Sequence, residues 1–99
     1  SRDRLDESDY EVGYFYFRIQ NYAGAIDRFT SILKRDPEFT RRDGVYFFLG
    51  ESLIKIKREA EALPYYEKLV SEFEQSEHLL ETKKRISTLK SQMEAKNPA

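Results

Sequence analysis

His78 is the only histidine in the sequence, and we test it first for catalytic chemistry because a serine or threonine nucleophile needs a neighbouring base. Ser76 and Thr82 are the hydroxyl residues nearest to it along the chain. All three belong to a polar stretch of the kind that begins a helix, so their proximity needs no catalytic explanation. We therefore expect His78 to be exposed near a helix N-terminus, and we expect the chain not to be an enzyme.

Charged residues are numerous but balanced. Lys and Arg number 17, Asp and Glu number 18, and the formal net charge is −1, which gives no overall field to hold a phosphate backbone. The basic run at 83–85 lies near Glu77 and Glu81, so we expect it to be a solvated helix face. For carboxylate pairs such as Glu59 with Glu61, the sequence does not indicate the pocket that acid–base catalysis needs. The sequence therefore predicts no nucleic-acid partner.

Residue types also argue against cofactors and metals. The chain has no cysteine and a single histidine, so neither a thiolate site nor a histidine-rich metal site can form, and no glycine-rich loop is present to hold a phosphate group. The longest apolar run, Val45–Leu49, is far shorter than the roughly 20 residues that span a bilayer. We expect a soluble chain with no cofactor, no metal and no transmembrane segment.

Aromatic and basic residues are better candidates for function than the polar ones. Tyr10, Tyr14 and Arg18 follow one another at a spacing of four, which places them on one face if the segment is helical. Tyrosine and arginine are the residue types that most often supply the binding energy of protein interfaces. The pattern therefore favours a protein-binding surface over an active site.

These side chains must be positioned by a repeated unit, because the sequence matches itself at an offset of 37 residues. Small residues align with small ones, and large apolar residues align with large ones. The matched pairs include Gly13 with Gly50, Ala25 with Ala62, Ile26 with Leu63, Phe29 with Tyr66, and Ile32 with Leu69. We interpret the match as two copies of one unit, in which the paired small residues let two helices cross closely.

Each copy is predicted to be an antiparallel helix pair. The first helices span about 6–19 and 43–55, and the second helices carry apolar residues at helical spacing from Ala25 and from Ala62 onwards. The turns at 20–21 and 57–58 are short enough to force hairpins. Asp36 precedes a proline and therefore ends the first pair.

A third apolar stripe follows Ser76 and runs from Leu79 to Met93 on an otherwise charged segment, as expected of the solubilising cap of a solenoid. The sequence therefore predicts an all-α, right-handed helical solenoid of two antiparallel helix pairs and a C-terminal capping helix. We expect a single domain of residues 1–99, with repeat one at about 6–39, repeat two at about 43–75 and the capping helix at about 77–96.

The repeat resembles the tetratricopeptide repeat. The first copy carries the pattern at Gly13, Tyr22, Ala25, Phe29 and Pro37, and the second copy carries it at Gly50, Ala62 and Tyr66. The second copy departs from the pattern at Glu59 and Glu74, and the offset of 37 rather than about 34 implies three extra residues, most simply Thr40–Arg42.

Three segments show a finer resemblance. The sequences of Arg4–Arg18, Asn21–Pro37 and Ala62–Val70 are similar to the C-terminal repeats of the BamD (YfiO) lipoproteins, which belong to the outer-membrane β-barrel assembly machinery. This resemblance implies a non-catalytic scaffold on the periplasmic side of the outer membrane, with a periplasmic domain of the barrel assembly protein as its partner. It also implies membrane attachment only through a lipid anchor outside this chain. The alternative is a periplasmic or cytoplasmic peptide-binding repeat module of a different, chaperone-like or envelope-division complex.

The resemblance further implies that the first helices line a concave binding face. The family's groove positions fall on Glu7, Tyr10, Tyr14, Phe17 and Arg18 in the first copy and on Phe47, Glu51, Ile54 and Lys55 in the second. We expect all of them except Glu7 and Ile54 to bind the partner. A second interpretation stays open for Tyr10, Tyr14 and Phe17, since each is also suited to completing the core between the repeats. A rival interface is the loop edge, formed by the loops at 39–43 and 74–77, with Arg41 and Arg42 as its binding residues.

Overall fold

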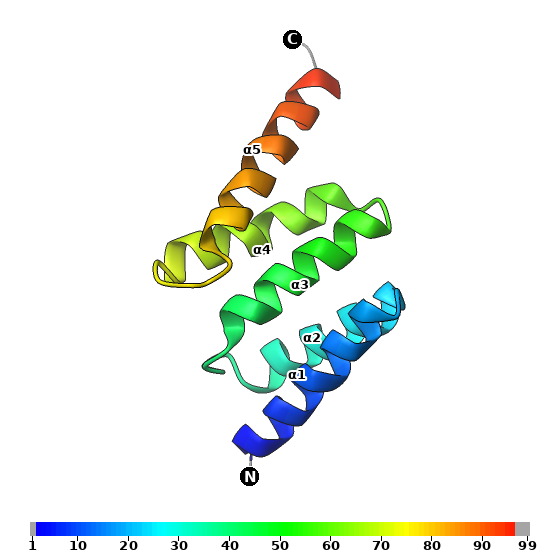
Figure 1. The fold of residues 1–99 in the computed structure, drawn as a ribbon, viewed down its shortest axis with the longest axis vertical. Coiled ribbons are helices and arrows are strands. Elements are labelled where there is room, and N and C mark those ends of the chain that lie inside the picture. Colours follow the sequence, from blue (N-terminus) through cyan, green and yellow to red (C-terminus); the bar gives the residue numbers. More distant parts are fainter. Residues whose placement is uncertain (1, 97–99) are drawn as a thin grey trace.

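Five helices make up the fold in a computed structural model that describes residues 2–96. They are α1 (Arg2–Arg18), α2 (Tyr22–Arg35), α3 (Arg42–Lys55), α4 (Glu59–Glu72) and α5 (Leu79–Lys96). In Figure 1, α1 pairs with α2 and α3 with α4, α5 packs on α4, and the N- and C-terminal ends of the chain lie at opposite ends of the molecule. The predicted all-α solenoid of two antiparallel pairs and a C-terminal helix is confirmed. Within the described residues, no helix combines the length and the apolar character needed to cross a membrane.

The turn inside each helix pair has the same geometry in both copies. Gln20 and Lys57, which are 37 residues apart, both adopt the left-handed backbone conformation, with φ of 65° and 67°. The amide that follows each one closes the helix end with a hydrogen bond of 2.8 Å, from Asn21 N to Tyr16 O and from Arg58 N to Leu53 O. The sequence offset therefore corresponds to a true structural repeat.

A glycine in the first helix of each pair allows the second helix to approach. A Cβ atom added to Gly13 would lie 2.8 Å from the ring of Phe29, and one added to Gly50 would lie 2.5 Å from the ring of Tyr66. The predicted close crossing is therefore present, but aromatic rings, rather than Ala25 and Ala62, lie nearest the two glycines.

The core consists of two apolar clusters in sequence along the solenoid. The first joins α1, α2 and α3 through residues that include Tyr10, Phe29, Ile32, Val45 and Leu49. The second joins α3, α4 and α5 through Leu53, Ala62, Tyr66 and Leu89. The C-terminal helix is thus part of the core, because its Leu89 completes the second cluster.

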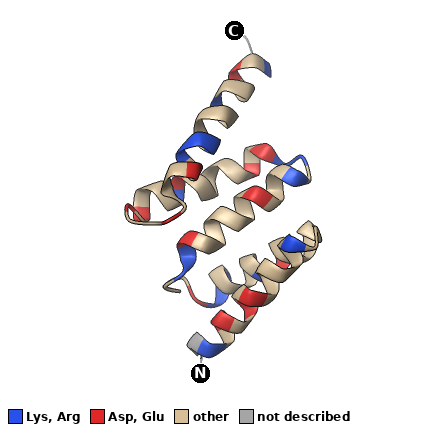
Figure 2. Cartoon of the chain, in the orientation of Figure 1, with Lys and Arg blue, Asp and Glu red and all other residues tan. Residues whose placement is uncertain are grey.

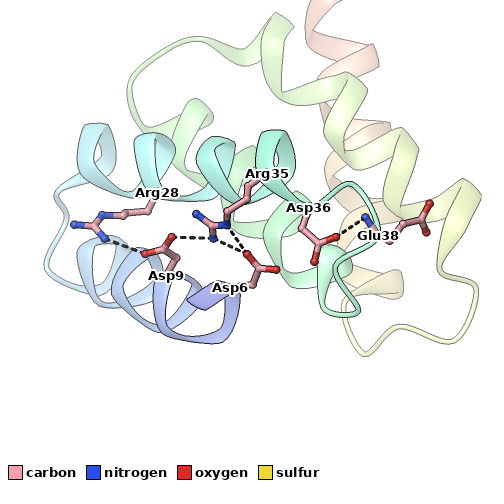
Figure 3. Close-up of polar contacts among 6 residues, drawn as sticks. All are labelled: Asp6, Asp9, Arg28, Arg35, Asp36 and Glu38. Atoms are coloured by element: carbon pink, nitrogen blue, oxygen red, sulfur yellow. Dashed lines mark hydrogen bonds and ion pairs between the residues drawn. The ribbon is translucent and has the colours of Figure 1, made fainter. Parts of the chain in front are cut away.

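A charged cluster ties α1 to α2 (Figure 3). Asp6 is fully buried, and its Oδ1 accepts a hydrogen bond of 2.8 Å from Nε of Arg35. The same guanidinium lies 3.0 Å from Asp9, which also pairs with Arg28 at 3.1 Å. Burial raises the pKa of Asp6, the Arg35 charge opposes that shift, and the nearby carboxyl group of Asp36 adds to it. Asp6 therefore takes up a proton more readily in the folded state than in the unfolded chain.

The raised pKa of Asp6 predicts a pH-dependent stability. Because the folded-state pKa lies above the ordinary value of 3.8, the stabilising effect of the protonated carboxyl is complete below pH 3.8 and is lost as the pH rises through the raised pKa. In Asp6→Asn, the amide oxygen still accepts from Arg35, but nothing at this position titrates. We expect urea unfolding at pH 4.5 and pH 7 to show a gain on acidification that is smaller in Asp6→Asn than in the natural chain. The exposed control Asp27→Asn should retain the full gain, and an equal gain in all three proteins would contradict the assignment.

The close approach at Gly50 predicts that even one added methyl group is costly. Gly50→Ala should lower the free energy of unfolding by about 1–3 kcal/mol, because the ring of Tyr66 must move out of the second core cluster. Ala23→Leu is a suitable control, since it adds a larger group at an exposed position of α2. Denaturant titrations measure both, and an unchanged midpoint for Gly50→Ala would show that the pair does not cross at this residue.

Candidate functional site

A hollow of about 280 Å³ lies between α1, α3 and the loop that leads into α5. It is lined by Tyr10, Tyr14, Arg41, Phe48, Glu77 and His78. Four of these six side chains are aromatic rings or an imidazole, and Arg41 and Glu77 add one charge of each sign. The hollow therefore offers a mainly aromatic surface with charged groups beside it.

The floor of the hollow is an aromatic platform that includes His78. The imidazole stacks on the ring of Phe47, with centroids 4.6 Å apart and planes 10° apart, and it meets the edge of Phe48 at 5.5 Å. His78 is therefore partly buried, and the expectation that it is an exposed residue is wrong.

The hydroxyl of Ser76 does not donate to the imidazole of His78. It donates to the Asp43 carboxylate over 2.6 Å and accepts a hydrogen bond of 3.0 Å from the backbone amide of His78. The arrangement fastens the start of α3 to the loop before α5. Because the hydroxyl donates to a carboxylate rather than to the imidazole, Ser76 and His78 do not form a nucleophile–base pair.

Two of the residues predicted for separate surfaces lie beside the same hollow. Tyr14 remains 38% exposed, meets Phe48 edge-to-face at 5.0 Å, and has the guanidinium of Arg18 at 5.9 Å from its ring. Arg41, which comes from the loop between the repeats, lies over the ring of Tyr10 at 4.0 Å and pairs with Glu7 at 2.8 Å. The groove and the loop edge therefore meet at Tyr14 and Arg41.

Tyr10 and Phe17 serve mainly as packing residues. Tyr10 is only 6% exposed and packs against Phe29 at 5.8 Å, and a side chain at Gly44 would overlap its hydroxyl. Burial raises the pKa of Tyr10 to about 12, although the Arg41 charge opposes the shift. Phe17 lies between Tyr22 and Phe48 at 5.8 and 5.1 Å. The structure thus favours the core interpretation of both residues, with Tyr10 also reaching the wall of the hollow.

Glu51 holds three helices together and also lines a hollow between α3 and α5. Its carboxylate accepts a hydrogen bond from the Tyr66 hydroxyl of α4 and one of 2.9 Å from Nε of Arg85 on α5. Burial, reinforced by the Glu51 carboxylate, raises the pKa of Tyr66, so its hydroxyl stays protonated and can donate. Lys55 is exposed at the edge of a second hollow of about 230 Å³ between α3 and α5. Of the three second-copy residues expected to bind, Phe47 lies beneath His78, Glu51 is partly buried and Lys55 alone is exposed.

Arg42 is likewise a structural residue. Its guanidinium donates to the Phe39 carbonyl over 3.0 Å, lies 3.3 Å from the Glu72 carboxylate and lies 5.1 Å from the ring of Phe73. Tyr46 also donates to Glu72, over 3.4 Å. These contacts fasten the start of α3 to the end of α4, so Arg42 has a structural role. Its part in binding a partner stays a prediction.

Phe48 and His78 are the lining residues that sequence reasoning did not propose for binding. Phe48 lies within the apolar run at 45–49, and the offset of 37 aligns it with Glu11, so neither the periodicity nor the repeat singles it out. The one available signal is the adjacent pair of phenylalanines on a first helix, whose rings meet edge-to-face at 5.2 Å. Among residues 2–96, no group of three His, Asp or Glu side chains is placed to hold a metal ion.

A comparison with known families finds a match. A family model described as tetratricopeptide repeat matches residues 7–38 and 45–76, which together cover more than half of the chain and contain most of α1 to α4. No curated protein and no solved structure matches the chain.

The position of Glu51 predicts that it stabilises the docking of α5. Glu51→Ala should lower the free energy of unfolding by about 2 kcal/mol, because the Tyr66 hydroxyl and the Arg85 guanidinium both lose a charged acceptor. Glu51→Gln, which keeps one acceptor oxygen, should lose less, and the exposed Lys55→Ala should lose little. Denaturant unfolding ranks the three variants, and equal stability for Glu51→Ala and Lys55→Ala would contradict the structural role.

Proposed function

The chain belongs to the tetratricopeptide repeat family, whose members are typically non-catalytic scaffolds for protein–protein interaction, and we propose that it binds its protein partner at the aromatic hollow. The observation that carries this proposal is the exposure of Tyr14 on an aromatic platform between Arg18 and Arg41. An amphipathic ring beside guanidinium groups is the composition of an interface hot spot. Apolar burial at the hollow supplies affinity, and the two cations select carboxylates on the partner.

For the identity of the partner, we propose a periplasmic domain of the outer-membrane barrel assembly protein, on the periplasmic side of the outer membrane. The support is the resemblance of Arg4–Arg18 and Asn21–Pro37 to the BamD lipoproteins. In this proposal the scaffold adds no chemistry and is held at the membrane only by a lipid anchor outside this chain.

One observation favours a second candidate, a peptide-binding repeat module of a different complex. The hollow of about 280 Å³ has room for one large side chain rather than for a folded surface. An extended peptide with an aromatic or aliphatic residue and a nearby carboxylate matches that size and the adjoining arginines.

The charges over the whole molecule fit a protein partner better than a nucleic acid. Figure 2 shows basic and acidic residues interleaved along the helices, in keeping with the formal net charge of −1. Nucleic-acid binding depends on a continuous basic surface that neutralises phosphates. The few cations beside the hollow are instead suited to single carboxylates.

The proposal is tested by titrating the chain with the periplasmic domain of the barrel assembly protein. Tyr14→Ala should weaken binding about thirtyfold, the effect of losing roughly 2 kcal/mol at a hot spot, with little change in the melting temperature. Arg18→Glu should slow association, and its effect should fade with added salt. Lys34→Glu on α2 is the control and should bind normally.

Arg41 cannot separate the groove from the loop edge, because it borders the hollow itself. Glu74→Lys, at an exposed position of the α4–α5 loop, makes that distinction. Loss of binding in Glu74→Lys with normal binding in Tyr14→Ala would assign the interface to the loop edge. Normal binding by all variants would place the interface outside both the hollow and the loop edge. No binding by the natural chain would remove the barrel assembly protein from consideration, and a peptide carrying an aromatic residue next to a carboxylate then tests the second candidate.

A further inference from the structure

A separate hollow of about 240 Å³ lies between the second helices of the two repeats, α2 and α4. It is lined by Thr30, Leu33, Lys34, Tyr65 and Lys68, and we call it the lysine hollow. Helix α3 runs between α2 and α4 and packs with both, so the two second helices make few direct contacts with each other (Figure 1). The lysine hollow shares no residue with the aromatic hollow, whose lining comes from α1, α3 and two loops.

The floor of the lysine hollow is apolar and held in place by the core. Leu33 and Tyr65 are partly buried, and both pack against the first core cluster. The ring of Tyr65 also stacks on that of Tyr46, with centroids 6.4 Å apart and planes 29° apart. The Thr30 hydroxyl donates to the Ile26 carbonyl over 2.8 Å, so it is not free to donate to a ligand. The donors that the hollow offers are therefore the two ammonium groups and the Tyr65 hydroxyl.

The two lysines carry positive charges that no carboxylate neutralises. Lys34 and Lys68 are exposed, and in the described part of the chain neither ammonium group has an ion-pair partner. Glu72, four residues after Lys68 on α4, is instead held by Arg42 at 3.3 Å. Asp36, two residues after Lys34, is buried. Two unpaired positive charges, one from each helix, thus border one small hollow.

This combination matches the chemistry of a phosphomonoester. Such a group carries nearly two negative charges at neutral pH and three acceptor oxygens, so one phosphate can pair with an ammonium group from each helix. A carboxylate carries a single charge and would leave one of the two lysines unpaired. The apolar floor then contacts the ring or chain that bears the phosphate, since an aromatic ring packs well on a tyrosine ring.

We propose that the lysine hollow binds a phosphomonoester carried on an aromatic or aliphatic group, with both lysines on the phosphate and with Leu33 and Tyr65 against the apolar part. The site goes beyond the proposed partner-binding function, because it lies on other helices and takes a different class of ligand. Binding should be weak and sensitive to salt, because both ammonium groups are exposed to solvent.

The proposal is tested with phenyl phosphate, titrated into the natural chain at low ionic strength while backbone amide signals are followed by NMR. The amides of residues 30–34 and 65–68 should shift, with a dissociation constant of about 1 mM. Phenyl sulfate has the same shape and one charge, so it should bind about fivefold more weakly. Inorganic phosphate lacks the ring and should also bind more weakly.

Three results of these titrations would contradict the proposal. No shift of these amides at about 10 mM phenyl phosphate would overturn the site as a whole. Equal affinity for phenyl sulfate would overturn the pairing of one phosphate with two lysines. Equal affinity for inorganic phosphate would overturn the role of the apolar floor.

Substitutions distinguish the site from a general attraction of anions. Lys34→Gln and Lys68→Gln should each weaken the binding of phenyl phosphate about fivefold. The melting temperature should stay unchanged, because neither ammonium group has an ion-pair partner in the described chain. Lys84→Gln is the matched control, since Lys84 is an exposed lysine on α5 that also lacks an ion-pair partner among the described residues. An equal loss in all three variants would overturn the proposal.

A short peptide that carries phosphotyrosine examines the source of the phosphate. Tighter binding of this peptide than of phenyl phosphate assigns the site to a phosphorylated side chain, and equal binding assigns it to a small phosphate ester. Lys34→Glu, the control for the aromatic hollow, should lose phenyl phosphate and still bind the protein partner. Tyr14→Ala should keep phenyl phosphate, so either proposal can fail without the other.

Discussion

The contact between an aromatic ring and a glycine, made once in each helix pair, is the constraint on which the rest of the structure depends. Phe29 lies against Gly13 and Tyr66 lies against Gly50, so both pairs close in the same way. Because the two pairs share one geometry, they also share one turn, with a left-handed residue at equivalent positions. Two similar units can then stack with a regular relation, which is what makes a short chain a solenoid.

The candidate binding surface is a product of this stacking rather than of any single helix. Tyr14 comes from the first repeat, Phe48 from the second, Arg41 from the loop between them and His78 from the loop that follows. Each of these side chains is supported by a neighbour: the imidazole stacks on Phe47, and the guanidinium lies on a buried tyrosine. The surface is therefore largely formed before a partner arrives, which reduces the ordering cost of binding.

The sequence alone predicted the fold because the fold is encoded locally, in helical spacing, in short turns and in a repeated glycine. It predicted the candidate site less well, since the roles of its residues depend on distant partners. Glu51 occupies a groove position in the repeat, but Arg85 of α5, 34 residues away, reaches back to it. The sequence predicts Arg41 and Tyr14 on competing surfaces, and only the stacking of the repeats brings both to one hollow. The sequence around His78 is typical of a helix start, and it does not predict that the imidazole stacks on Phe47.

The linear order of the helices also determines how the molecule folds and where it opens first. Contacts between helices join mainly those that follow one another along the chain, so folding requires few distant segments to meet, and topologies of this kind fold rapidly. Stability in such an array is the sum of neighbouring interfaces, and an end helix with one neighbour opens more readily than a central one. We therefore expect the backbone amides of α3, placed between α2 and α4, to exchange most slowly with solvent, and those of α1 and α5 to exchange faster.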